Sequence, residues 1–534
     1  MTDSRVRPDV RRTAGAGLPA GPAYRSPRSV VKAAWQSNRD LLDSASSLAA
    51  TTGVTSVLGF AYWAVAARLF SQRAVGYGSA SVSAMTLLGT VGMLGLGTVL
   101  IGELPRRRPR AGLVSAALLT SGLGSLVLGL MFAVVAPRIG AQFRDMSHPL
   151  GQMALFTAGV VLTGVSLVFD QATIGLLRGG LQLSRNLAFA VAKLVALPAA
   201  AVILHDQFGV GITLTWVAGT ALSLLLVALR LRFAGTAVLP RPDWRVLRGL
   251  GRTAVAHSWL NLAITVPRSL MPVLVTVIVS PSANAAFYAA WTLSGFLYIV
   301  PMHLATVLFA IASADPEKIA RKLRFTLRLS VLIGVPGMAA LGLGAHLALS
   351  MFGASYARAA TVPLWLLVIG YVPTIPKVHY IAVCRATGRI ARAAAVLTAA
   401  ATLEVAAAAA GGVSGGMKGL TLALLTVFIV EGLVTAPSVF RAAMGHGRHR
   451  RGPLHVASGN PAMAARPHGR PPGHAESHPA GHSPRQSLPG PAPAPAGPGQ
   501  DRNAASEQER QWEGIAVLLS LARSAGVDPP HPPS

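Results

Sequence analysis

Six charged side chains lie inside long apolar stretches of this sequence, where an isolated charge is expensive. Placing one in lipid costs about 3 kcal/mol or more, so each needs a partner, a polar cavity or a function. Cations in such positions can bind phosphate or line a substrate cavity, and acids can carry a coupling ion. The cations are Arg268, Lys193 and Lys377, and the acids are Asp170, Glu404 and Glu431.

Arg268 is the most informative of the six because it lies near the middle of its apolar stretch. Pro267 and Pro272 flank it, and each proline removes a helix hydrogen bond and favours a kink. The guanidinium is too deep to reach water easily by extending along the helix. A midplane cation between two kinks therefore indicates a substrate cavity.

Purely structural explanations of these charges remain open from the residues alone. Lys193 could pair with Asp170 and fix the register of two helices, and Arg268 could pair with an acid such as Glu431. Such pairs would satisfy the charges without any ligand.

The elements that must position these side chains are twelve apolar stretches, each long enough to cross a membrane. A helix needs about 20 mostly apolar residues to span the hydrocarbon core, and continuous stretches of this length exclude a β-barrel. The sequence thus predicts an all-α polytopic membrane protein. The expected spans are 44–68, 77–101, 111–136, 150–176, 183–204, 209–232, 252–280, 284–312, 325–349, 358–383, 390–411 and 418–440.

The longest internal loop divides these spans into two sets of six. We expect a first lobe at 44–232, a cytoplasmic loop at 233–251 and a second lobe at 252–440. The basic tail 1–43 and the Pro-, His- and Arg-rich tail 441–534 lack core-forming residues, so both are expected to be disordered. Within the second tail, 512–523 is apolar enough for one short interfacial helix.

Lysine and arginine fall almost entirely in every second gap between the spans. Arg107, Arg245 and Lys322 lie in such gaps, whereas the gaps before the sixth and eighth spans contain neither residue type. Cytoplasmic loops are the ones enriched in Lys and Arg. The pattern therefore predicts a multi-pass protein of the cell membrane with both termini in the cytoplasm.

Composition excludes several other classes. The chain has 534 residues, 12% of them charged, with a net charge of +28 spread over tails and short loops rather than one patch, so nucleic-acid binding is not expected. Its mean hydropathy of +0.51 is that of a membrane protein. Cys384 is the one cysteine, and the tail histidines are irregularly spaced, so we predict no metal site. There is no Walker, HExxH or GxSxG motif and no long outer loop, hence no expected cofactor, catalytic residue or enzymatic activity.

Residues 47–107 carry a resemblance to a known family. The first span ends in small residues and Arg68, the turn contains Gly-Tyr-Gly at 76–78, and a Gly-rich second span ends at a basic loop. This hairpin resembles that of actinobacterial polysaccharide-biosynthesis flippases, which belong to the multidrug/oligosaccharidyl-lipid/polysaccharide (MOP) exporter superfamily. The agreement continues to about residue 440 as topology.

The resemblance implies a MATE-like fold with two six-helix lobes around a central cavity, working by alternating access. It implies a substrate of the undecaprenyl-diphosphate-linked oligosaccharide type, carried for synthesis of cell-surface polysaccharide, including lipopolysaccharide. Arg268 is similar in placement to cavity cations that hold a pyrophosphate, and Lys193 and Lys377 are further candidates. The first span has only Arg68, at its outer end, where related flippases have several arginines. Membrane lipids and polysaccharide-synthesis enzymes are the expected partners.

Three other functions remain compatible with the sequence. A cation-coupled multidrug antiporter of the MATE type would use the same architecture and depend on Asp170, Glu404 and Glu431 for ion coupling. An integral glycosyltransferase or ligase is the enzyme alternative, weakened by the short outer loops. A scaffold that recruits enzymes through its tails is the third.

Overall fold

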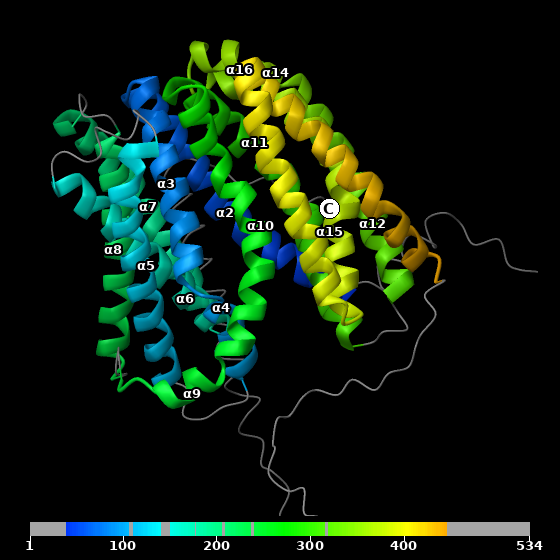
Figure 1. Ribbon diagram of the computed structural model, residues 1–534, viewed down its shortest axis with the longest axis horizontal. Helices are drawn as coiled ribbons and strands as arrows, with labels where there is room; N and C mark the ends of the chain where they lie inside the picture. The colour runs from blue at the N-terminus through cyan, green and yellow to red at the C-terminus, as the bar shows by residue number, and fades with distance from the viewer. Residues whose placement is uncertain are drawn as a thin grey trace, which may run out of the picture. The chain divides into compact units, whose positions relative to one another are not determined.

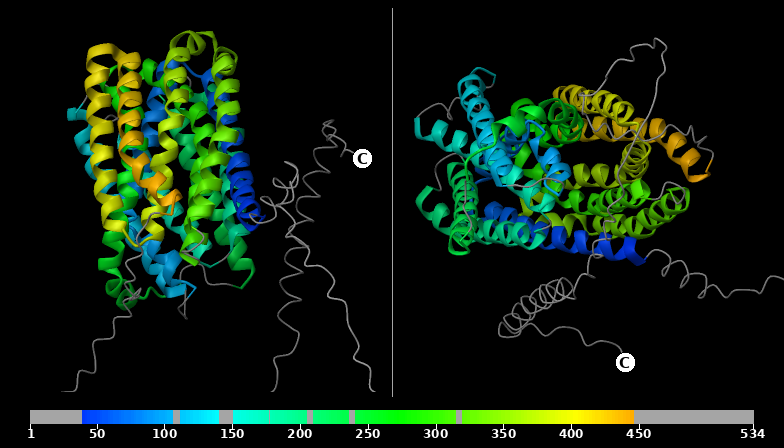
Figure 2. Two further views of the ribbon diagram at one scale, coloured as in Figure 1. Left: turned by 90° about the vertical axis from the view of Figure 1, so that its right-hand side faces the viewer. Right: turned by 90° about the horizontal axis from the view of Figure 1, so that it is seen from below.

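The computed structural model describes residues 39–105, 111–139, 150–176, 178–204, 209–235, 240–314 and 319–445, and these form helices joined by short turns, without a strand. Most of both tails, including the helix expected at 512–523, lies outside the described residues. Figures 1 and 2 show the long helices running side by side as a bundle. The all-α polytopic class predicted from the sequence is confirmed.

Seven of the described helices come from the first half of the chain. We refer to them as the N-terminal helices: α2 (Arg39–Leu69), α3 (Gln72–Gly92), α4 (Leu96–Glu103), α5 (Ala111–Ile139), α6 (Leu150–Gly175), α7 (Gly179–Leu204) and α8 (Val210–Phe233). Ser71 caps α3 by accepting a hydrogen bond from the amide of Ala74, as serine does at helix starts. The second expected span is broken, since α3 and α4 meet at 55° where Leu94 and Gly95 adopt φ values of 51° and 70°.

Eight helices come from the described part of the second half. The short α9 (Trp244–Gly249) lies in the predicted inter-lobe loop. The C-terminal helices are α10 (Gly251–Ile278), α11 (Pro281–Ala314), α12 (Ile319–Leu343), α13 (Ala345–Ser350), α14 (Ala354–Ile369), α15 (Tyr371–Ala386) and α16 (Ile390–Ala443). The tenth expected span is also broken, because α14 and α15 meet at 45° at Gly370.

The 54-residue α16 is a helical hairpin. Gly415 and Gly416 leave helical geometry, with φ of −138° and 58°, and the two arms then pack backbone to backbone. A Cβ added at Gly411 would lie 2.5 Å from the carbonyl oxygen of Gly419. Glycine at both positions is what permits this close approach. Residues 390–414 and 417–443 are thus two spans, as the sequence predicted.

Length and hydropathy identify eight described helices that could cross a membrane, or ten when each bent pair is taken as one span. That number treats α16 as one span and omits α2, whose described apolar part, Gly53–Leu69, is short. Helix by helix, the described bundle therefore follows the twelve-span expectation, and the chain is a multi-pass membrane protein. The lobe and tail boundaries stay predictions.

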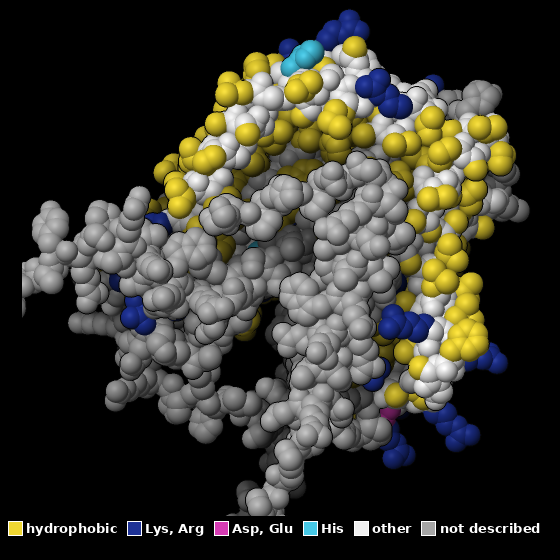
Figure 3. All heavy atoms as spheres, turned by 180° about the vertical axis from the view of Figure 1, so that it is seen from behind, with side chains coloured by type: hydrophobic (Ala, Val, Ile, Leu, Met, Phe, Trp, Pro, Cys, Tyr) yellow, Lys and Arg dark blue, Asp and Glu magenta, His cyan; other side chains and the backbone are white. Residues whose placement is uncertain are grey.

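The outer surface of the bundle suits lipid. Exposed side chains on the long helices are mainly large and apolar, for example Val202 (81%), Leu332 (71%) and Leu433 (69%). Figure 3 shows such side chains covering the described helices of one face, with Lys and Arg mostly towards its edges. This is the distribution expected when a hydrocarbon layer surrounds the helices and water meets their ends.

The two sets of helices are joined most tightly where α3 meets the start of α11. The buried amide of Asn284 donates to the carbonyl oxygen of Gly76 at 2.8 Å and to Ser79 Oγ at 3.0 Å. Gly76 itself contacts the backbone of Pro281. Nearby, Arg68 donates from its Nε to the carbonyl oxygen of Met351 and from an Nη to that of Ser350, at 2.9 and 2.7 Å. These contacts close one end of the interface between the N-terminal and C-terminal helices.

Substituting Gly76 should measurably destabilise this junction. A Cβ at position 76 would lie 1.7 Å from the carbonyl oxygen of Pro281, so a backbone must move. We expect Gly76→Ala to lower the melting temperature of the purified protein, corresponding to about 1–3 kcal/mol of overpacking. Gly59→Ala in α2 is the control, because nothing lies within 4 Å of its added methyl. Equal melting temperatures for the two variants would contradict the close packing.

Candidate functional site

Lys377 holds two carboxylates in the interior of the C-terminal helices. Its Nζ donates to Glu404 Oε1 at 2.5 Å and to Glu431 Oε2 at 2.7 Å. The lysine lies on α15, about two turns beyond the bend at Gly370, and the two acids lie on opposite arms of the α16 hairpin. The carboxylates are 8% and 6% exposed. We call these three residues the acid–lysine cluster.

The acid–lysine cluster is short of one positive charge. With all three groups ionised, one ammonium faces two carboxylates, and Glu431 Oε1 is buried without a hydrogen-bond partner. A buried net charge and an unsatisfied oxygen are both costly. The cluster can therefore retain one proton, which would neutralise it and let Glu431 act as a donor.

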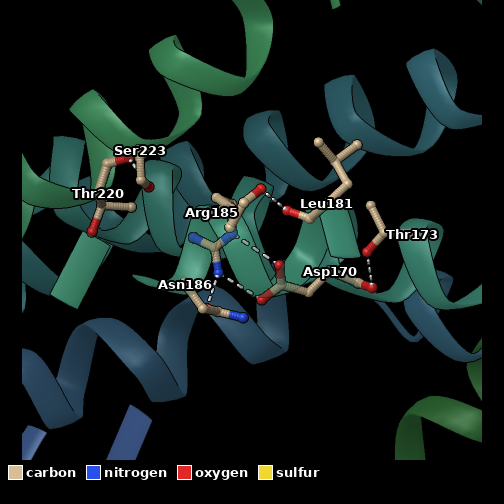
Figure 4. A network of polar contacts seen from close by, with 8 residues as sticks. Asp170, Thr173, Leu181, Arg185, Asn186, Thr220 and Ser223 are labelled. Carbon is tan, nitrogen blue, oxygen red and sulfur yellow. Dashed lines mark hydrogen bonds and ion pairs between the residues drawn. The ribbon is translucent and has the colours of Figure 1, made fainter. Parts of the chain in front are cut away.

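Asp170 pairs with Arg185 rather than with Lys193. Arg185, near the start of α7, makes two hydrogen bonds to the carboxylate on α6, of 2.9 Å to Oδ1 and 2.6 Å to Oδ2, and one of 2.6 Å to Asn186 Oδ1. Figure 4 shows this fork-like arrangement, the strongest geometry for an arginine–carboxylate pair. The alternative pairing of Lys193 with Asp170 considered from the sequence is therefore wrong, and Asp170 has a structural partner.

Lys193 instead lies among aromatic rings. Its Nζ is 3.8 Å from the ring centre of Trp216, 4.4 Å from that of Phe189 and 4.7 Å from that of Tyr62. These three rings, from α8, α7 and α2, form what we call the aromatic cage. Lys193 is 4% exposed, and the structure gives its ammonium no acid or hydrogen-bond acceptor among the described residues.

Arg268 lies on the packed side of α10. Asn261, Met271 and Val275 share its helix face by their spacing. Asn261 donates to Thr98 Oγ1 of α4 at 2.7 Å, and Met271 and Val275 are buried. Arg268 between them is nevertheless exposed. The exposed part of its side chain therefore lies on a face of α10 that packs against other helices of the bundle.

Two tyrosines of α11 lie near Arg268 and connect it to the other charged residues. Tyr288 and Tyr298 both lie within electrostatic range of its guanidinium, and Tyr298 is also within range of Glu404. On the other side, the rings of Tyr288 and Trp63 are 4.7 Å apart, and those of Trp63 and Trp216 are 6.2 Å apart. An aromatic series thus runs from the aromatic cage to Arg268.

Among the deep charged side chains of the described helices, acids and bases differ in whether they have an ionic partner. All three acids have a basic partner, whereas Arg268 and Lys193 have no acid. Arg328 is a further exposed arginine, but it shares its face of α12 with the lipid-exposed Leu332 and Val335 and is close enough to the helix start to extend to the surface. A cavity beside Arg268 would therefore favour an anion.

Sequence reasoning missed several of these residues. Arg185 falls within the expected span 183–204 but was not considered as a partner for Asp170, and Tyr288, Tyr298 and Trp216 read as ordinary apolar positions. The spacing of Arg268 and Asn261 on one face could have indicated a polar stripe. Nothing in the sequence indicates that Lys193 faces aromatic rings. No group of three metal-ligating side chains occurs in the described part of the chain.

Comparison with solved structures reveals the same fold elsewhere. The chain is similar to a multidrug resistance MATE family transporter of the MOP superfamily in its inward-facing conformation, with a TM-score of 0.56 and 16% identity over 73% of this chain and 94% of the other. The outward-facing conformation gives 0.51 and 14%, with 76% and 95% covered. A MATE protein in complex with MaL6 gives 0.51 and 15%, with 76% and 96% covered.

These similarities show the fold and not the substrate, because the identities are low. No family model matches the sequence, and no characterised relative matches it either. The MATE-like architecture expected from the first hairpin is confirmed by structures that belong to the MOP superfamily. The polysaccharide-flippase subtype stays a prediction.

Proposed function

We propose that this protein is a membrane transporter of the MOP type that moves a lipid-linked oligosaccharide, of the undecaprenyl-diphosphate kind, across the cell membrane for cell-surface polysaccharide synthesis. The proposal rests on one observation, that the deep side chain left without an ionic partner is positively charged. Arg268 lies exposed on the packed face of its helix without an acid partner among the described residues, while the deep acids are all paired.

The chemistry of such a substrate suits this arrangement. Its lipid tail can stay in the bilayer, whereas its diphosphate and sugar hydroxyls need a polar path. The planar guanidinium of Arg268 can donate two parallel hydrogen bonds to phosphate oxygens and replace part of their hydration. Alternating movement of the two sets of helices would then expose the site first to one side and then to the other.

The direct test reconstitutes the purified protein in vesicles that contain a lipid-linked oligosaccharide with a labelled sugar. A glycosidase added outside cleaves only the outer-leaflet pool. We expect empty vesicles to keep the inner-leaflet pool intact and vesicles with the protein to lose it. Persistent protection of the inner pool in the presence of folded protein would refute the proposal.

A cation-coupled multidrug antiporter is the second candidate, and the acid–lysine cluster favours it. The cluster can hold an exchangeable proton on Glu431, and each of the MATE structures compared above shares the fold. The same vesicles loaded with a cationic dye separate the two functions. Proton-driven dye movement without glycolipid movement would favour the antiporter.

We further propose that both termini face the cytoplasm, as the distribution of Lys and Arg predicts. The buried Cys384 can be replaced by serine so that single cysteines report accessibility. A cysteine at Ser282 should react with a membrane-impermeant reagent in intact cells, whereas one at Arg245 should react only after the cells are opened. Labelling of position 245 from outside would reverse the orientation.

A further inference from the structure

Lys193 is a buried cation whose only described partners are aromatic faces. Three rings surround its ammonium at 3.8–4.7 Å. The base of its side chain is fixed by close packing of α7 on α8, since a Cβ at Gly219 would lie 3.1 Å from the Cβ of Lys193. The ammonium end, by contrast, is held by no hydrogen bond to any residue that the structure describes.

This environment satisfies the charge of Lys193 but not its three hydrogen-bond donors. A desolvated cation–π contact contributes about 2 kcal/mol, and a hydrogen bond between charged groups contributes a similar amount for each donor used. A phosphate oxygen within reach would therefore compete well with the rings. The lysine stem is flexible enough for its amine to change partners while its root stays in place.

The aromatic cage is also linked to Arg268 through neighbouring rings. Trp216, one wall of the cage, is half-buried, and its ring neighbours Trp63, which in turn contacts Tyr288. Tyr288 lies within electrostatic range of Arg268. A series of aromatic side chains thus links the two unpaired cations. An anion bound at Arg268 would therefore be connected through these rings to a second positive charge.

Resting on the proposed function, we infer that Lys193 is a second phosphate-binding cation of the same site, stored in the aromatic cage until a diphosphate draws its amine out. The ligand class is a polyprenyl diphosphate. Arg268 holds one phosphate through its guanidinium, and the released amine of Lys193 neutralises part of the remaining charge. The cage keeps the free transporter from exposing two repelling cations to an empty cavity.

Tryptophan fluorescence reports whether the amine of Lys193 is in the aromatic cage, because an ammonium in contact with an indole quenches the indole's fluorescence. We expect farnesyl diphosphate, added to the detergent-solubilised protein, to raise the emission with saturation, and uncharged farnesol to leave it unchanged. Trp216→Phe keeps an aromatic ring in the cage but should lose the rise. This measurement needs no change at Lys193 and so does not depend on whether a variant folds.

Binding of the same ligand, measured by calorimetry, gives the second readout. Lys193→Met should weaken farnesyl diphosphate binding about tenfold, the loss of roughly one charge-assisted hydrogen bond, and Lys193→Arg should recover part of it. Lys418→Met, in the α16 hairpin, is the matched control and should bind normally. Suppose that the unaltered protein binds farnesyl diphosphate without a change in emission, and that Lys193→Met binds it with the same affinity. Lys193 would then be a structural contact and not a phosphate-binding residue. No binding by the unaltered protein would refute the proposed function itself.

Discussion

Arg268→Ala is expected to reduce glycolipid transport at least a hundredfold while expression and membrane insertion stay near normal. The variant loses two charge-assisted hydrogen bonds to phosphate, each contributing about 1.5–3 kcal/mol. It should fold, because the side chain is exposed and makes no ion pair among the described residues. Arg268→Lys should retain partial activity at best, since the charge remains but the bidentate geometry is lost.

The glycosidase-protection assay in vesicles measures this effect. Arg328→Ala is the matched control, because it removes an exposed arginine from α12 on a face with Leu332 and Val335. It should transport at the wild-type rate. Transport by Arg268→Ala at that rate would remove the residue from the mechanism. Failure of the variant to insert would show that Arg268 serves folding.

Lys377→Met should destabilise the protein more than any other single change considered. It leaves Glu404 and Glu431 facing one another in the membrane interior, and removing one partner of a buried ion pair costs about 3–5 kcal/mol. Glu431→Gln should be tolerated, because the remaining Lys377 and Glu404 are balanced in charge. Thermal unfolding of the purified proteins measures both effects.

The double variant Lys377→Met with Glu431→Gln tests the cause. It leaves a single carboxyl, which can be protonated, so we expect the melting temperature to recover part of the loss. Lys418→Met removes a lysine outside the cluster and should leave the melting temperature unchanged. A melting temperature of Lys377→Met equal to that of the unaltered protein would show that the cluster contributes nothing to stability.

The sequence predicted the spans well because their signal is local. An apolar stretch of sufficient length must cross the membrane as a helix whatever its neighbours are, so even the hairpin of α16 could be recognised from two stretches separated by Gly415 and Gly416. The exact ends of the α16 helices and the bends at Leu94 and Gly370 depend on tertiary contacts. Hydropathy along the sequence does not encode these features.

Charge pairing was harder to predict because it depends on which helix faces are apposed. Glu404 and Glu431 were recognised as buried acids, and Lys377 as a buried cation, yet their meeting requires the α16 hairpin to fold against α15. Lys193 and Asp170 have opposite charges and lie on consecutive spans, which suggested a pair. Arg185, about two turns closer to the start of α7, reaches the acid instead and leaves Lys193 with the rings.

The acid–lysine cluster also imposes an order on biogenesis. Glu404 follows Lys377 by 27 residues and Glu431 follows it by 54. At about 5–20 residues per second, the ribosome supplies the second acid roughly 3–11 s after the lysine. During that interval α15 carries an incompletely matched ammonium, so its stable integration must await the final hairpin. A nascent chain arrested before Glu404 should therefore remain bound to the insertion machinery, and one arrested after the hairpin has emerged should be released into the bilayer.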